Sequence, residues 1–127
     1  MSRILLAEDD GTMRVFLSKA LTRAGHAVTA VDDGLLALEA AAAQRFDLLI
    51  ADIVMPSLDG FQLAAKAKSR QPGLKVMFIT GFAAVTLSNS DGQPRALRDA
   101  IGSDARVLSK PFHLRDLVEE VEKILAA

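Results

Sequence analysis

Short apolar runs alternate with longer amphipathic segments along most of the chain, and this alternation limits the possible folds more than any other feature. The apolar runs predict five strands, at 3–7, 27–31, 48–52, 75–80 and 106–109. The segments between them carry apolar residues at helical spacing, at 13–24, 35–43, 61–70 and from about 113 onward. Because strands that alternate with helices form a parallel sheet covered on both faces, the sequence predicts an α/β fold.

The run from Leu48 to Asp52 indicates where the centre of this sheet lies. Its first four residues are all apolar, so both faces of the strand must be covered by helices. The segment 81–104 gives a much weaker signal, because 88–94 has the composition of a loop and only 95–101 suggests a short helix. A fourth helix is nevertheless expected somewhere in this segment.

Charge and composition exclude several classes of function. The chain has 127 residues, with 15 Lys and Arg against 16 Asp and Glu, which gives no basic surface for nucleic acid or for an anionic membrane. It has no cysteine, and therefore no disulfides and no thiolate metal site. We find no signal peptide and no stretch long enough to span a membrane. We expect one domain over residues 1–127, without an output domain, in the cytoplasm.

Polar residues stand at the ends of four predicted strands. They are Glu8, Asp9 and Asp10 after the first, Asp52 at the end of the third, Thr80 at the end of the fourth and Lys110 after the fifth. In open α/β sheets the functional crevice lies at the carboxyl ends of the strands, so these side chains should converge on one edge. A single acid there is most often a helix cap, and Asp10 suits that role. The joint pattern is far more specific than any one residue.

Clustered carboxylates repel each other unless a cation lies between them, and Mg²⁺ prefers oxygen ligands. With a metal bound, a carboxylate facing it could attack a phosphorus atom, while Lys110 and Thr80 hold the transferring oxygens. Asp52 is the best candidate for the nucleophile because it ends the central strand. The product would be an aspartyl phosphate.

The motifs at these strand ends resemble those of the receiver domains of two-component response regulators, over nearly the whole length. The matching segments are 4–10, 47–60, 78–81 and 108–112. Within this family, segments 78–85 and 108–115 are similar to the CpdR type of single-domain receiver. The resemblance implies a flavodoxin-like (βα)5 fold, a three-layer sandwich with a parallel sheet in the order 2-1-3-4-5.

The resemblance also implies roles for particular residues. Asp52 would be phosphorylated. Asp9, Asp52, the backbone carbonyl of Val54 and, through a water molecule, Glu8 would bind Mg²⁺ or Mn²⁺. Thr80 and Lys110 would contact the phosphate.

Two further positions follow from the same resemblance. The Lys110–Pro111 peptide bond would be cis. Many receivers carry an aromatic switch residue three positions before the lysine, but this chain has Val107 there. We therefore expect a degenerate switch position, with output through other parts of the surface, such as the loop that follows Thr80 and carries Phe82.

The partners are also implied by the resemblance. The phosphoryl donor would be a histidine kinase or a histidine phosphotransfer protein that docks near the first helix. The CpdR type implies a phosphorelay that controls regulated proteolysis, with an AAA+ protease as the downstream target. We expect no nucleic acid and no membrane among the partners.

Two alternatives stay open. The chain could be a pseudo-receiver that binds partners without phosphorylation, although Asp9, Asp52, Thr80 and Lys110 form a complete set. It could also be a phosphatase of the haloacid dehalogenase type, but those enzymes need a second acid two residues after the nucleophile, where this chain has Val54. A nucleotide site is excluded, since 10–12 contains only one glycine.

Overall fold

A computed structural model describes residues 2–55, 57–80 and 106–126. Five parallel strands form one sheet in the order β2-β1-β3-β4-β5, which confirms the expected fold. The strands are β1 (Arg3–Ala7), β2 (Ala27–Val31), β3 (Leu48–Asp52), β4 (Lys75–Thr80) and β5 (Arg106–Ser109). Each coincides with a predicted run. For β1, β3 and β4 the reason is burial, because a buried strand is a compact apolar run in the sequence.

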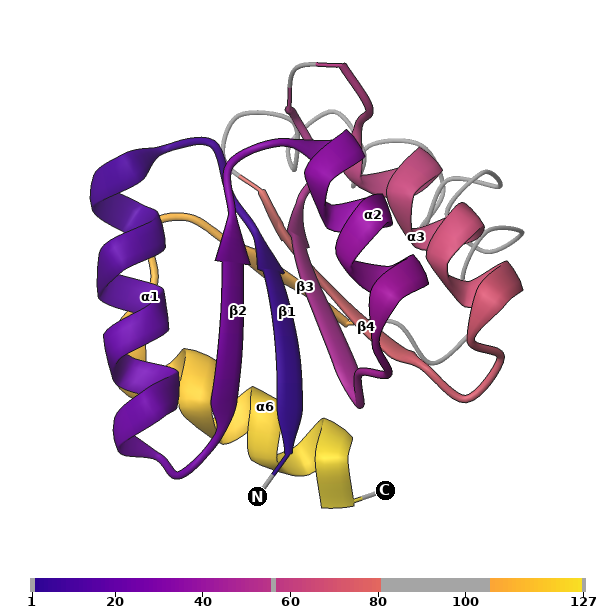
Figure 1. The fold of residues 1–127 in the computed structure, drawn as a ribbon. Helices are drawn as coiled ribbons and strands as arrows, with labels where there is room; N and C mark the ends of the chain where they lie inside the picture. Colours follow the sequence, from indigo (N-terminus) through magenta and orange to yellow (C-terminus); the bar gives the residue numbers. More distant parts are fainter. Residues whose placement is uncertain (1, 56, 81–105, 127) are drawn as a thin grey trace, which may run out of the picture.

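Helices cover both faces of the sheet, as Figure 1 shows. They are α1 (Gly11–Arg23), α2 (Gly34–Ala43), α3 (Gly60–Arg70) and α6 (Leu114–Ala126). Helices α1 and α6 pack on one face, and α2 and α3 pack on the other. The additional helix expected within 81–104 and the short helix at 95–101 lie outside the described residues. Within the described part of the chain, no helix is both long enough and apolar enough to cross a membrane.

Strand β3 lies between two hydrophobic clusters. Leu48 and Ile50 pack with α1 and α6, whereas Leu49 and Ala51 pack with α2 and α3. All five residues of the strand are buried, which explains why the run is apolar on both faces. This packing fixes the end of the strand, and therefore the position of Asp52.

Three helices begin at the carboxyl edge of the sheet, each with an aspartate as its N-cap. Asp10 caps α1 by accepting hydrogen bonds from the backbone N–H groups of Thr12 and Met13, at 3.0 and 3.2 Å. Asp33 caps α2, and Asp59 forms a capping box at the start of α3. The capping role suggested for Asp10 is therefore confirmed.

Candidate functional site

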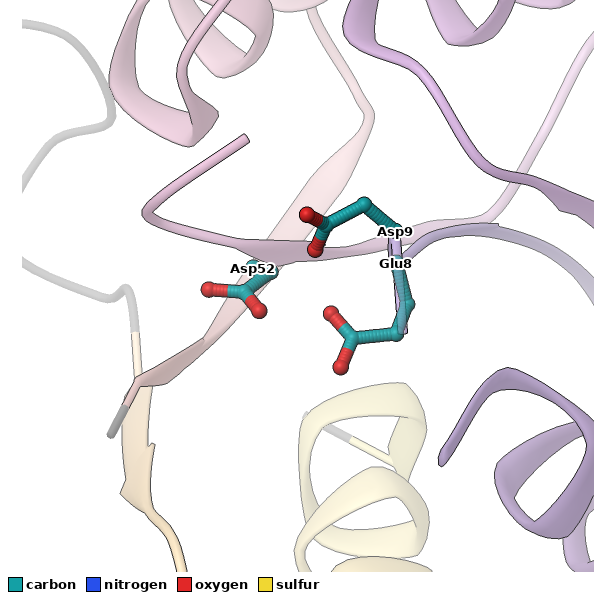
Figure 2. Close-up of side chains that lie close together, drawn as sticks. All are labelled: Glu8, Asp9 and Asp52. Carbon is teal, nitrogen blue, oxygen red and sulfur yellow. The ribbon is translucent and has the colours of Figure 1, made fainter. Parts of the chain in front are cut away.

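Three carboxylates meet where β1 and β3 end. Glu8, Asp9 and Asp52 each offer one oxygen, and these oxygens lie within 4.8 Å of one another. Figure 2 shows Glu8 and Asp9, which follow β1, beside Asp52 at the end of β3. Glu8 and Asp52 are buried, whereas Asp9 is exposed. Three carboxylates so close together suit a hard divalent cation, because each supplies the oxygen ligands that Mg²⁺ prefers.

Lys110 joins two of these carboxylates. Its Nζ lies 2.8 Å from Glu8 Oε1 and 3.0 Å from Asp52 Oδ2. The Lys110 backbone is fixed as well, since its N–H donates to the Thr80 carbonyl. The Lys110–Pro111 peptide bond is cis. The ammonium group is therefore held against the acids by the end of β5.

The carboxylate of Asp52 has a defined orientation. Its Oδ1 accepts a hydrogen bond from the Val54 N–H at 3.0 Å, and its Oδ2 faces Lys110. The next residue, Ile53, donates its N–H to the Ile79 carbonyl at 3.1 Å, so the chain continues along β4 before it turns. These bonds leave little freedom for the side chain that ends the central strand.

Two buried oxygens in this region have no hydrogen-bond partner among the described residues. They are Thr80 Oγ1 and Glu8 Oε2. Thr80 is fully buried at the end of β4. Leaving such a group unpaired costs about 1–3 kcal/mol, so a site that contains two of them is suited to a ligand that supplies the missing partners. A metal for the carboxylate and an oxyanion for the hydroxyl both fit this requirement.

Burial changes the ionisation of the site. It raises the pKa of Glu8 from 4.5 to about 8, and the neighbouring Asp52 carboxylate acts in the same direction, against the opposing effect of Lys110. Burial opposes the charged form of Lys110, but hydrogen bonds to Glu8 and Asp52 outweigh it and raise the pKa of this ammonium group. The metal-free site therefore retains a proton on Glu8 and a positive charge on Lys110 near neutral pH.

This proton predicts a pH dependence of the metal-free protein. The unfolded chain ionises Glu8 near its ordinary pKa of 4.5, whereas the folded chain ionises it near 8. A raised acid pKa means that stability is lost as pH rises between these values, by on the order of a few kcal/mol. In EDTA, we expect the melting temperature to fall from pH 5 to pH 8 in the wild type and to change much less in Glu8→Gln.

The matched control for this experiment is Glu39→Gln, since Glu39 is an exposed glutamate on α2. It should keep the slope of the wild type. An equally steep decline in Glu8→Gln would contradict the raised pKa of Glu8.

The structure separates the residues that the sequence grouped together. Glu8, Asp52 and Lys110 are in direct contact, and Asp9 lies beside them. The Asp10 side chain instead accepts hydrogen bonds from backbone N–H groups in the first turn of α1.

Two predicted positions are exposed. They are Val54, which is 64% exposed and bonds Asp52 through its backbone N–H, and Val107, which is 38% exposed on β5. The predicted role of the loop that carries Phe82 falls outside the described residues.

One residue near the site was missed in the sequence. The Arg14 Nη1 donates a hydrogen bond to the backbone carbonyl of Glu8 at 2.9 Å. This bond fixes the backbone between the end of β1 and the start of α1. The only signal in the sequence is a basic residue one helical turn after the Asp10 cap. Such residues are common on exposed helix faces, so this signal alone does not identify the contact.

Comparisons with known proteins agree on one family. The family model for the response regulator receiver domain matches residues 4–122. The response regulator receiver protein CpdR of Brucella abortus (strain 2308) is 56% identical over 127 residues, which cover 100% of this chain and 99% of that protein. Other curated relatives are longer, and this chain spans 24% to 50% of their length.

Solved structures match along almost the entire chain. A response regulator receiver protein from Sinorhizobium medicae WSM419 has a TM-score of 0.83 and 30% identity, with 99% of this chain and 95% of that chain covered. The response regulator protein TrrA from Thermotoga maritima, solved in complex with Mg²⁺ and BeF, has a TM-score of 0.79 and 28% identity, with 98% and 99% covered.

Proposed function

The chain belongs to the response regulator receiver domain family, and on this basis we propose that Asp52 is its phosphoryl acceptor. Members of this family are generally phosphoacceptors rather than conventional enzymes. The observation that carries the proposal is the environment of Asp52. Its buried carboxylate ends the central strand, contacts the Lys110 ammonium at 3.0 Å and lies within 4.8 Å of oxygens of Glu8 and Asp9.

The divalent cation, Mg²⁺ or Mn²⁺, would be held by carboxylates of Asp9 and Asp52 and by the Val54 carbonyl, with Glu8 acting through a water molecule. When bound, the cation supplies positive charge that neutralises the acids and the transferring oxygens. Glu8 fits a role through water, because its Oε1 is occupied by Lys110 while its Oε2 has no partner among the described residues.

In the proposed transfer, an Asp52 carboxylate oxygen forms a bond to phosphorus. The bond between phosphorus and the histidine nitrogen of the donor breaks, and its electron pair stays on that nitrogen. Lys110 then pairs with a phosphoryl oxygen, and the buried Thr80 hydroxyl donates to another. Phosphorylation adds negative charge and acceptor oxygens, which these two side chains are placed to bind.

The phosphoryl donor is proposed to be a histidine kinase or a histidine phosphotransfer protein that docks on α1. This helix begins beside the site, and its Val15 and Phe16 are 48% and 54% exposed. The helix also carries Arg14, Lys19 and Arg23, and it contains no acidic residue. Exposed apolar side chains on a helix that also carries basic residues suit a partner surface that is apolar and acidic.

We further propose that output passes through protein contacts of this single domain, within a phosphorelay that controls an AAA+ protease. The similarity to CpdR along the full length supports this proposal. The exposed Val107 on β5 also supports a route that differs from the common aromatic switch, since valine has no ring that could turn between two positions.

The phosphoacceptor proposal is tested with acetyl phosphate and Mg²⁺, followed by intact-mass spectrometry. We expect one phosphoryl adduct on the wild-type chain, and none when EDTA removes the metal. A protein that gains no adduct while it binds Mg²⁺ would support the pseudo-receiver alternative. Sustained release of phosphate from a phosphomonoester would instead indicate a phosphatase.

A further inference from the structure

A hydrogen bond outside the carboxylate cluster joins the turn before α2 to the loop after β3. The Ser57 hydroxyl donates to Asp33 Oδ1 at 2.8 Å. The same oxygen accepts the Leu35 N–H at 2.7 Å as the N-cap of α2. Asp33 therefore holds the start of a helix and the loop at the same time. These two bonds also keep the pKa of Asp33 below its usual value of 3.8, so the acceptor remains charged at neutral pH.

The backbone packing at this point is equally close. A Cβ added to Gly34 would overlap the Leu58 carbonyl oxygen and lie 2.8 Å from the Leu58 Cβ. No other residue type fits there without displacing the loop. The side chains of Leu58 and Met55 are also buried among α2, α3 and the sheet. The far end of the loop is therefore pressed against α2.

Ser57 occupies a conformation that glycine adopts more easily. Its φ is 65°, in the left-handed region that non-glycine residues rarely adopt. Glycine would relieve this cost but would lack the hydroxyl that reaches Asp33. The hydrogen bond is therefore the specific contribution of the serine side chain.

The near end of the loop is fixed to the site. The Gly60 N–H donates to the Ile53 carbonyl at 3.0 Å, which closes the loop at its base. The Val54 N–H bonds Asp52 Oδ1 at 3.0 Å. Val54 thus lies between the base of the loop and the contact at Ser57, and it is the residue proposed above to offer its carbonyl to the cation.

We infer that Asp33 and Ser57 are positioning residues whose hydrogen bond holds the loop that carries Val54 and thereby sets the affinity of the site for a divalent cation. This inference rests on the proposed function. Asp33 and Ser57 are not members of the carboxylate cluster, so both would act through the loop that carries Val54. Partners that orient metal ligands from outside the site commonly change metal affinity in this way.

The first test compares Mg²⁺ dissociation constants, measured by calorimetry, for the wild type and Ser57→Gly. Glycine accepts the φ of this position and removes the side chain that carries the hydroxyl. We expect about tenfold weaker Mg²⁺ binding, the lower end of the effect that outer partners of metal ligands have. Ser57→Asn should restore most of the affinity, because asparagine tolerates the left-handed region and its amide can donate to Asp33. Ser69→Ala, on the exposed side of α3, is the matched control and should bind like the wild type.

A second measurement separates positioning from a general loss of stability. In EDTA, hydrogen exchange of the Val54 amide should be faster in Ser57→Gly than in Ser69→Ala, at a temperature where both are fully folded. Asp33→Ala should weaken Mg²⁺ binding as much as Ser57→Gly does, and the double variant should be no weaker than either one. The loss of the α2 cap in Asp33→Ala affects the melting temperature but does not create this non-additivity.

The outcomes distinguish the inference from the proposed function. Wild-type protein that binds Mg²⁺ while Ser57→Gly binds it equally well would overturn the inference alone. Additive losses in the double variant would also overturn it. Wild-type protein that binds no Mg²⁺ would contradict the proposed metal site, and the inference with it.

Discussion

Asp52→Asn is expected to abolish the formation of a phosphoryl adduct on this protein. The amide is close in size to the carboxylate but lacks the negatively charged oxygen that attacks phosphorus, so the loss should be complete rather than partial. The fold should survive, because the amide oxygen can still accept a hydrogen bond from the Val54 N–H and Lys110 keeps its contact with Glu8. Intact-mass spectrometry after incubation with acetyl phosphate and Mg²⁺ measures the effect.

The control for this variant is Asp32→Asn, which changes an exposed aspartate outside the carboxylate cluster. It should form the adduct as the wild type does. If Asp52→Asn formed as much adduct as the wild type, the phosphoryl acceptor would be another acid. Asp9 would be the first to test, since it is exposed and lies beside the same site.

Gly60→Ala is expected to lower the free energy of unfolding by about 3 kcal/mol, at the upper end of what overpacking commonly costs. A Cβ at this position would lie 2.5 Å from the Asp52 carbonyl oxygen and 2.9 Å from the Ile53 Cα. Both neighbours are backbone atoms, so neither can turn away as a side chain could. The loop or the end of β3 must shift, and Asp52 shifts with it.

Helix propensity alone would predict the opposite, namely that Gly60→Ala raises the free energy of unfolding. Gly60 is the first residue of α3, where alanine ordinarily favours a helix over glycine by up to about 1 kcal/mol. Gly73→Ala is the matched control, because nothing lies within 4 Å of an added Cβ there. Urea unfolding in EDTA should leave Gly73→Ala near the wild type. A Gly60→Ala protein of unchanged stability would contradict the close packing described for this loop.

The strands and most of the site edge were predictable from the sequence. Strand β3 gave a clear signal because a strand buried on both faces must be apolar throughout, and its last residue is then placed by the parallel sheet. Four strand ends with polar residues lie at the same edge, so topology alone predicts that Asp52, Lys110 and the acids after β1 lie close together.

The separate roles of the three consecutive acids after β1 could not be predicted in the same way. Glu8, Asp9 and Asp10 follow β1 directly, yet one is buried against Lys110, one is exposed and one caps α1. Which way each side chain points depends on the turn between the strand and the helix. The sequence pattern does not record the dihedral angles of that turn.

Contacts between separate turns were also beyond the sequence. The bond between Ser57 and Asp33 requires the left-handed φ of Ser57 and the packing of Gly34 against Leu58. The contact between Arg14 and the Glu8 carbonyl likewise depends on how α1 leaves the sheet. The raised pKa of Glu8 follows from burial, which composition does not reveal for a single acid.

The contacts of Lys110 link the centre of the sheet, where Asp52 lies, to its edge. Its backbone bonds Thr80 at the end of β4, and its ammonium group reaches Asp52 on β3 and Glu8 after β1, although Lys110 itself follows the edge strand β5. One residue therefore connects the middle of the sheet to its margin. Phosphorylation of Asp52, as proposed above, would change the contacts of Lys110, and α6 begins only four positions further along the chain, at Leu114. The proposed phosphorylation would therefore alter the edge of the sheet through Lys110 itself, and no rearrangement of core side chains would be needed between the two places.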